Sequence, residues 1–258
     1  MPLPLPAKNN GSMQPSFQTQ TNDPGQNRFG AQDAVSTRHA EISALMEDGR
    51  IVIGQRKIPT LPVFDDAFAA FAQGTLFKTR NGFTAVEDLQ PGDCLATVTR
   101  HFEQVLWIGS APFAPTSNGA RLHLTRFMAD SFGMNRPESF VSLGPAARLV
   151  LPPPERSMDG PSNQCVTPAR KYQDGVNIIK VVPQTPVRLF HLGLRTHTAI
   201  IANGLPVESY HPGPMPNTHQ SQTLRDGFLS LFPHVSALTD FGAMNFIRQA
   251  NHLHPAVE

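Results

Sequence analysis

The stretch Asp65–Leu95, DDAFAAFAQGTLFKTRNGFTAVEDLQPGDCL, decides how the rest of the chain is interpreted. Its strand-forming runs TLFKT and FTAVEDL are separated by RNG and followed by the turn QPGD. Asn81-Gly82 and Pro91-Gly92-Asp93 are typical turn residues, because Gly adopts positive φ and Pro fixes its own φ. The stretch therefore predicts a β-hairpin that leads through a second turn into a third strand.

The pattern of short apolar runs between turn residues continues down the chain. Further strands are expected at CLATVT, QVLWIGS, ARLHLT, SFVSLG, ARLVLP, NIIKVV, VRLFHLGL and THTAIIANGLPVESY. Many short strands at this spacing, with almost no helical periodicity before residue 220, are typical of a sandwich or barrel. We therefore expect an all-β domain, followed by short helices.

Composition divides the chain into four parts. Residues 1–34 are rich in Pro, Asn, Gln, Gly and Ser, and we expect them to form a disordered arm. Residues 35–69 form an accessory segment, in which Ser36 is expected to cap a short helix over STRHAEISALMEDG and RIVIG to form a brief strand. Residues 70–213 hold the β domain. Residues 214–258 hold a helical cap and tail, with amphipathic candidates in LRDGFLSLFPHVSAL and DFGAMNFIRQA.

Two of these parts allow alternative interpretations. Ser36 and His39 can be taken as a nucleophile and its base, but a helix cap and a surface imidazole are the favoured interpretation. The C-terminal helices can cover an exposed edge of the β domain or dock a partner protein, and we favour the first.

Composition bears on partners and location. The chain has 21 basic and 20 acidic residues spread along it, so neither nucleic acid nor an anionic membrane is favoured as a partner. No apolar run approaches the roughly 20 residues that cross a bilayer, and the N-terminus has no ordinary signal peptide. The cytoplasm is the default location, with export by a route that needs no N-terminal signal left open. A protein partner is also left open.

The cysteines and histidines form no metal motif. Cys94 and Cys165 allow one disulfide but no zinc framework, and whether they pair stays open. No histidine has a spacing with carboxylates or thiols that defines a metal site, so we expect neither a metal nor a cofactor. The histidines considered are His211, His219, His234, His252 and His254.

Two blocks of the chain carry a family resemblance. GTLFKTRNGFTAVEDLQPGDCLAT with the later QVLWIGS resembles the N-terminal block of Hint domains, the module shared by hedgehog autoprocessing regions and inteins, and in particular bacterial stand-alone Hint proteins. THTAIIANGLPVESYHPG, Thr196–Gly213, resembles the C-terminal block of that subset. The resemblance implies a Hint-like β fold over residues 70–213 and intramolecular autoprocessing as the family's chemistry.

The family's chemistry needs a nucleophile, donors that polarise the scissile amide, and an acid. A thiol or hydroxyl at the first position attacks the preceding carbonyl and converts the amide to a thioester or ester. The resemblance places this first position at Ala70, so the junction is Ala69–Ala70. A methyl group cannot attack, and the nearest polar residues, Asp65 and Asp66, are poor replacements.

The internal block of the family is also altered. In VSLGPAARLVL the family's His falls on Ala147, before Arg148, and its hydroxyl residue falls on Gly144, with Ser142 nearby. His197 is the one remnant of the catalytic set, and we favour a packing or hydrogen-bonding role for it over a proton donor, because a lone acid accelerates little.

Other matching residues are interpreted as structural. Asp93, beside Gly92, is expected to hold its turn through an Asx-type hydrogen bond, and Thr75 to bond within its strand. Asn203-Gly204 is expected to form a turn inside a hairpin rather than a self-cleaving asparagine.

Three hypotheses for function follow. The favoured one is a Hint-type fold that has lost autoprocessing and serves as a binding or structural module, not an enzyme. The first alternative is an active self-cleaving or acyl-transferring domain with an unrecognised nucleophile. The second is a β interaction module unrelated to Hint domains, which requires that the strands of Thr75–Thr79 and Thr196–Ile201 are not neighbours.

Overall fold

The computed structural model describes residues 36–117, 119–151, 165–214 and 222–248. The predicted arm of residues 1–34, and His219, His252 and His254, lie outside the described residues. All described residues belong to one compact unit that begins at Val35. Its strands are β1 Thr37–Leu45, β2 Ile51–Pro59, β3 Phe71–Ala72, β4 Leu76–Thr79, β5 Gly82–Ala85, β6 Cys94–Ala96, β7 Phe102–Phe113, β8 Thr116–Ser117, β9 Ala120–Arg121, β10 Leu124–Phe127, β11 Val141–Leu143, β12 Arg148–Leu149, β13 Cys165–Pro168, β14 Ile178–Val181, β15 Val187–Leu194, β16 Ala199–Ala202, β17 Leu205–Glu208 and β18 Ile247–Arg248.

Helices are few and short. The α-helices are α1 Pro62–Asp65 and α2 Gln222–Leu229, and the 3₁₀ helices include Val86–Asp88, Ala169–Tyr172 and Leu238–Phe241. The prediction of an all-β fold with short C-terminal helices is confirmed.

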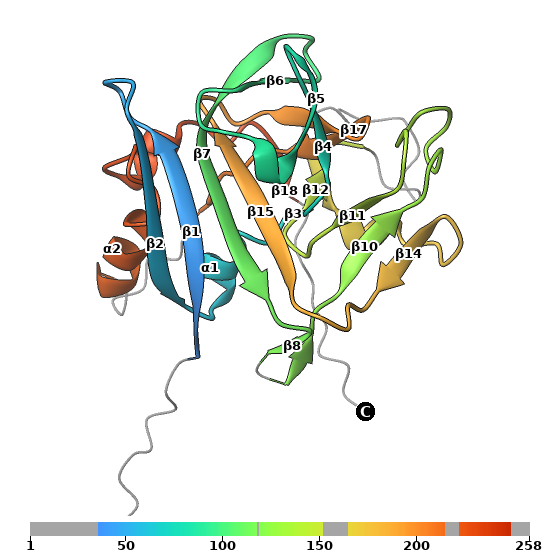
Figure 1. The fold of residues 1–258 in the computed structure, drawn as a ribbon, viewed down its shortest axis with the longest axis horizontal. Helices are drawn as coiled ribbons and strands as arrows, with labels where there is room; N and C mark the ends of the chain where they lie inside the picture. Colours follow the sequence, from blue (N-terminus) through green and yellow to red (C-terminus); the bar gives the residue numbers. More distant parts are fainter. Residues whose placement is uncertain (1–35, 118, 152–164, 215–221, 249–258) are drawn as a thin grey trace, which may run out of the picture. The chain divides into compact units, whose positions relative to one another are not determined.

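Most strands join one strongly bent sheet. Its path runs β14-β10-β11-β3-β15-β7-β6-β4-β16-β17-β12-β13-β18, and the hairpin of β1 and β2 joins it through β7. In Figure 1 the long strands β2, β1, β7 and β15 lie side by side, and α2 stands beside β2. The N-terminal accessory strands therefore extend the same sheet that holds the rest of the domain.

The predicted hairpins form where expected. Strands β4 and β5 pair around the turn Arg80-Asn81, with Thr79 opposite Gly82. Strands β16 and β17 pair around Asn203-Gly204, whose φ values of 47° and 83° are those of a hairpin turn with two left-handed residues. Asn203 also locks this turn to β4, because its Oδ1 accepts the Leu76 N–H at 2.7 Å.

Two sequence predictions of helices are wrong. Ser36 caps no helix, because the following residues form β1, which pairs with β2 along its whole length. The alternating Ala40, Ile42 and Ala44 are buried on one face of β1, and sheet pairing overrides the weak helical periodicity. The second C-terminal helix is replaced by the 3₁₀ turn Leu238–Phe241 and by β18, which pairs with β13.

The core has two main parts. One fills the interior of the bent sheet and includes Phe71, Phe77 and Leu192. The other lies between the sheet and the C-terminal segment, where the Trp107 indole N–H donates to the Leu231 carbonyl at 2.7 Å and its ring lies 4.6 Å from that of Phe232. The C-terminal segment is thus a packed part of the fold.

Candidate functional site

The junction Ala69–Ala70 lies inside the protein. Helix α1 leads into Ala67–Ala70, all of which are buried, and β3 follows at once. The Ala70 N–H donates to Phe190 O at 3.1 Å. The two junction carbonyls accept from the loop after β11: Ala69 O from the Ala146 N–H at 2.9 Å and Ala70 O from the Gly144 N–H at 2.7 Å. The N–H and both carbonyls at the junction are therefore all hydrogen-bonded to other backbone groups.

The positions of the lost family residues surround this junction. Gly144 has no space for a side chain, because a Cβ there would lie 2.2 Å from Ala69 O. Ala147 is buried, and its N–H and carbonyl bond to Gly144 O and the Ala169 N–H. Ser142 does not substitute for the missing hydroxyl, because its Oγ accepts from Arg126 Nε at 3.1 Å on β10. Ala70, Gly144 and Ala147 are therefore linked by backbone hydrogen bonds, and none of these three residues carries a group that could attack or polarise the junction amide.

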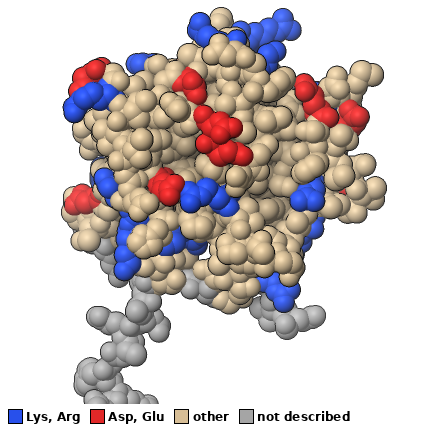
Figure 2. All heavy atoms as spheres, in the orientation of Figure 1, with Lys and Arg blue, Asp and Glu red and all other residues tan. Residues whose placement is uncertain are grey.

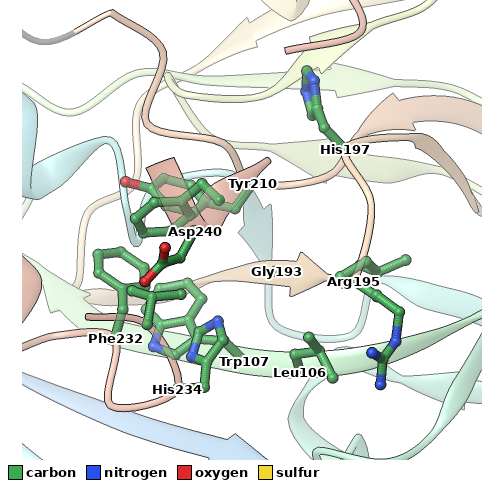
Figure 3. A pocket seen from close by; sticks show the side chains of 12 residues that line it. Leu106, Trp107, Gly193, Arg195, His197, Tyr210, Phe232, His234 and Asp240 are labelled. Carbon is green, nitrogen blue, oxygen red and sulfur yellow. The ribbon is translucent and has the colours of Figure 1, made fainter. Parts of the chain in front are cut away.

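His197 is fully buried and has both ring nitrogens engaged. Its Nδ1 accepts the Asn245 N–H at 3.0 Å, so Nε2 carries the proton and donates to Glu208 Oε1 at 2.9 Å. Figure 3 shows the ring turned away from the cluster of Trp107 and Tyr210, although His197 lines the same small cavity. That cavity has a volume of about 30 Å³, close to the share of one water molecule.

Glu208 is the centre of a buried ionic network that includes His197. Arg248 Nε lies 2.9 Å from Glu208 Oε1, and Arg148 Nη1 lies 3.5 Å from Oε2. Burial alone would raise the pKa of Glu208, but the hydrogen bond from His197 and the charges of Arg248 and Arg148 together lower it to about 2. Glu208 therefore stays ionised and fixes the tautomer of His197.

This network extends to the junction. Arg148 Nη1 donates to Ala146 O at 3.2 Å, and Ala146 in turn donates to Ala69 O. Arg148 Nη2 also lies 3.8 Å from Asp66 Oδ2. A chain of polar contacts thus joins β12 and β17 to the junction amide.

The Hint domain profile matches residues 69–214, which is more than half of the 258-residue chain. The chain belongs to the Hint domain family. The bacterial intein-like domain from Clostridium thermocellum is 13% identical, with a TM-score of 0.39 over 55% of this chain and 99% of that one. The MchDnaB-1 intein is 15% identical, with a TM-score of 0.36 over 55% of this chain and 100% of that one. The DnaB intein from Synechocystis sp. PCC 6803 is 11% identical, with a TM-score of 0.33 over 55% and 99%. No curated protein matches the chain.

The two blocks of this Hint domain are neighbours in space. The Asn203 N–H donates to Leu76 O at 2.7 Å, and Ala202 of β16 pairs with Phe77 of β4. The hypothesis of a β module unrelated to Hint domains is therefore wrong.

Two carboxylates lie just before the residues that match the Hint domain, and each has a cationic neighbour. Asp65 pairs with Arg38, whose Nε lies 3.1 Å from Oδ1, and burial raises the pKa of Asp65 to about 6. Burial also raises the pKa of Asp66, while Arg148 opposes this. The Asp66 carbonyl accepts a hydrogen bond from His191 Nδ1 at 2.8 Å. Burial lowers the pKa of the His191 imidazole to about 3.

The remaining singled-out residues have local partners. Asp93 Oδ2 accepts the Gln90 N–H at 2.8 Å across the turn that holds Gly92. Thr75 Oγ1 donates to Ala72 O at 2.6 Å. Cys94 and Cys165 are both free thiols. Among the described residues, no three metal-binding side chains gather, and no helix there is long and apolar enough to cross a membrane.

Sequence reasoning missed most of the ionic network. It used Glu208 and Arg148 only as landmarks of the family blocks, and it did not consider Arg248, Asn245 or His191. The signal available for Glu208 and Arg148 was a charged residue inside an apolar strand, since such residues are buried only when paired. Nothing local in the sequence indicates that Asn245 reaches His197 or that Arg248 reaches Glu208.

Proposed function

We propose that this Hint domain protein does not cleave itself and serves as a binding or structural module. One observation carries the proposal: Ala69 O lies where a side chain of Gly144 would be, so the junction carbonyl fills the space of a group that would activate it. The first position, Ala70, also has only a methyl group.

The electrostatics of the site support the same proposal. An acid that protonates a leaving amine needs a proton free to move toward that amine. His197 holds its proton against Glu208, and its other nitrogen accepts from the backbone. The role that these contacts favour for His197 is to join β17 to the C-terminal segment through Asn245.

The segment before the junction also supports a structural role. Phe64 and Phe68 lie in the same core cluster as Trp107, and β1 pairs with β7. Residues 36–69 are thus built into the domain. Cleavage at the junction would therefore cut through the core of the domain and would not release an independent upstream segment.

The test is an intact-mass time course of the full chain, with and without a thiol and with hydroxylamine. These reagents open any thioester or ester at the junction. We expect one species at 28.2 kDa throughout, in every condition. Fragments with a break at Ala69–Ala70 would overturn the proposal and would favour an active domain with another nucleophile.

A further inference from the structure

One face of the sheet carries a row of side chains across several strands. The pairing register places Ile53 of β2 opposite Ser43 of β1, and Ser43 opposite Ile108 of β7. Paired residues in adjacent strands point to the same face of a sheet. These three side chains therefore form one continuous line across β2, β1 and β7, which lie side by side in Figure 1.

A second row closes one end of this surface. Glu41 lies opposite Ser110, and Ser110 lies opposite Phe190 of β15. Arg188 Nη1 donates to Glu41 Oε2 at 2.6 Å and to Ser110 Oγ at 3.1 Å. The charge of Glu41 is thus neutralised within the surface.

The segment Val86–Pro91 stands against this sheet face and turns it into a groove. The groove has a volume of about 390 Å³. Its floor includes Ser43 and Ile108, one wall includes Ile51 and Ile53, and the opposite wall is the Val86–Pro91 segment. We call it the β1–β7 groove.

The wall formed by β2 is unusually apolar for a solvent-facing surface. Ile53 is 79% exposed and Ile51 is 44% exposed, and both lie beside the groove. Single exposed apolar residues are common, but two aliphatic side chains beside a concave surface that Ile108 and Phe190 also line mark a contact site.

The charge of the groove indicates which charged group a ligand should carry next to its apolar part. Glu87 lines the opposite wall, is exposed, and accepts the Gly74 N–H at 2.8 Å. Among the described residues Glu87 takes part in no ion pair, whereas Arg188, which contacts the lining residues Glu41 and Ser110, is already paired with Glu41. Figure 2 shows acidic side chains gathered near the centre of this face. A ligand with a positive charge complements the groove.

We propose that the β1–β7 groove binds a short peptide segment that presents an aliphatic side chain next to a Lys or Arg. The aliphatic side chain packs between Ile53 and the Val86–Pro91 segment, and the cation lies beside the carboxylate of Glu87. Apart from Phe190, whose carbonyl accepts the Ala70 N–H, the groove is built from residues other than those that close the junction. Failure of peptide binding would therefore leave the proposal of an uncleaved chain untouched.

The test is fluorescence anisotropy with the full chain and two labelled probe peptides, Gly-Ile-Lys-Ile-Gly and Gly-Ile-Glu-Ile-Gly. We expect the Lys peptide to bind more tightly, by about threefold to fivefold, with a difference that shrinks as salt is raised. Glu87→Gln, which keeps an acceptor for Gly74, should abolish this preference. Ile53→Ser should weaken both peptides by about tenfold.

Matched controls separate the groove from general effects. Glu47→Gln removes an exposed acid on the β1–β2 turn, and Val176→Ser removes a side chain that is 77% exposed and does not line the groove. Both should bind the Lys peptide as the unchanged protein does. The proposal is overturned if neither peptide binds at about 1 mM, a weak-binding limit, or if Ile53→Ser binds normally. It is also overturned if sedimentation shows a dimer that Ile53→Ser converts to a monomer, because the groove then faces a second copy.

Discussion

The carbonyl oxygen of Ala69 occupies the space beside Gly144 that any side chain there would need, with only 2.2 Å between that oxygen and an added Cβ. The Gly144 N–H at the same time donates to Ala70 O. The loop after β11 and the junction are therefore packed backbone against backbone. This close packing explains why a glycine, and not a hydroxyl residue, fits at this position.

The first prediction follows from that packing. Gly144→Ala should lower the free energy of unfolding by about 1–3 kcal/mol or more, because the methyl group must displace buried backbone. The matched control is Gly54→Ala on β2, where an added Cβ meets only the flexible guanidinium of Arg56 at 3.0 Å. That control should leave stability unchanged or raise it by up to about 1 kcal/mol, because Ala restricts the unfolded chain more than Gly does. Urea denaturation measures both, and equal effects would show that the junction loop is not tightly packed.

The second prediction concerns Glu208. Its pKa of about 2 lies below the ordinary 4.5, so its ionised form stabilises the fold above pH 4.5, and this contribution is lost as the pH falls toward 2. Glu208→Gln should cost about 3 kcal/mol at pH 7, because it leaves buried cations without their counter-charge. The cost should shrink below pH 4.5.

The control for Glu208 is Asp48→Asn. The Asp48 side chain is 50% exposed in its ion pair with Arg50, and such surface pairs contribute little to stability because water screens them. Chemical denaturation at pH 7 and pH 3 distinguishes the two variants. A pH-independent cost for Glu208→Gln would mean that packing, and not charge, explains its effect.

The third prediction is a loss of stability in mild acid. Burial lowers the pKa of His191 to about 3 and of His234 to about 4, from 6.5, so below pH 6.5 the unfolded chain takes up protons that the folded chain cannot. Asp65 opposes this, because its folded pKa of about 6 exceeds 3.8. For these three groups, two losses against one gain leave a net fall of up to about 1.4 kcal/mol per pH unit between pH 6 and pH 4.5. Burial also lowers the pKa of His211 and His123, which adds to the fall, and raises the pKa of Asp66, which opposes it.

His234→Phe tests this balance. His234 faces the cavity that Asp240 and Arg195 also line (Figure 3), and its Nδ1 has no hydrogen-bond partner among the described residues. The variant should have a nearly flat stability between pH 6 and pH 4.5, whereas the exposed His39→Gln should behave as the unchanged protein does. Stability that rises on acidification of the unchanged protein would contradict the prediction.

The fourth prediction uses the single tryptophan as a reporter. Phe232→Ala removes a ring centred 4.6 Å from that of Trp107 and should cost about 3–5 kcal/mol, with a red shift of the native fluorescence. Leu224→Ala on α2 is the control, because Leu224 is 41% exposed. Unchanged fluorescence in Phe232→Ala would show that the C-terminal segment does not shield Trp107.

Much of the fold was predictable from local patterns. The turn residues Asn81-Gly82 and Asn203-Gly204 carry their own conformational signals, so the two hairpins followed from the sequence, although the first loop is formed by Arg80-Asn81 with Gly82 as its closing residue. Segment β1 was mistaken for a helix because STRHAEISALM fits both periodicities, and only its pairing with β2 and β7 decides between them. In the same way, the segment predicted as the second C-terminal helix forms the strand β18 because it pairs with β13.

The candidate site was predictable only in part. The absence of a nucleophile at Ala70 and of an imidazole at Ala147 could be read from the family blocks. That Ala69 O lies against Gly144, and that Arg248 reaches Glu208, depends on contacts between residues far apart in the chain. Such contacts depend on the tertiary fold, so no local sequence pattern predicts them.

Native-state hydrogen exchange at the junction tests the central claim most directly. The amides of Ala70, Gly144 and Ala146 donate to Phe190, Ala70 and Ala69, and together they close the junction. If the junction is part of the core, these three amides exchange only through global unfolding, with the same opening free energy as the central amides of β7 and β15. Exchange of the three amides through a local opening, while β7 and β15 stay protected, would contradict the account, because it would mean that the junction can be reached in the folded protein.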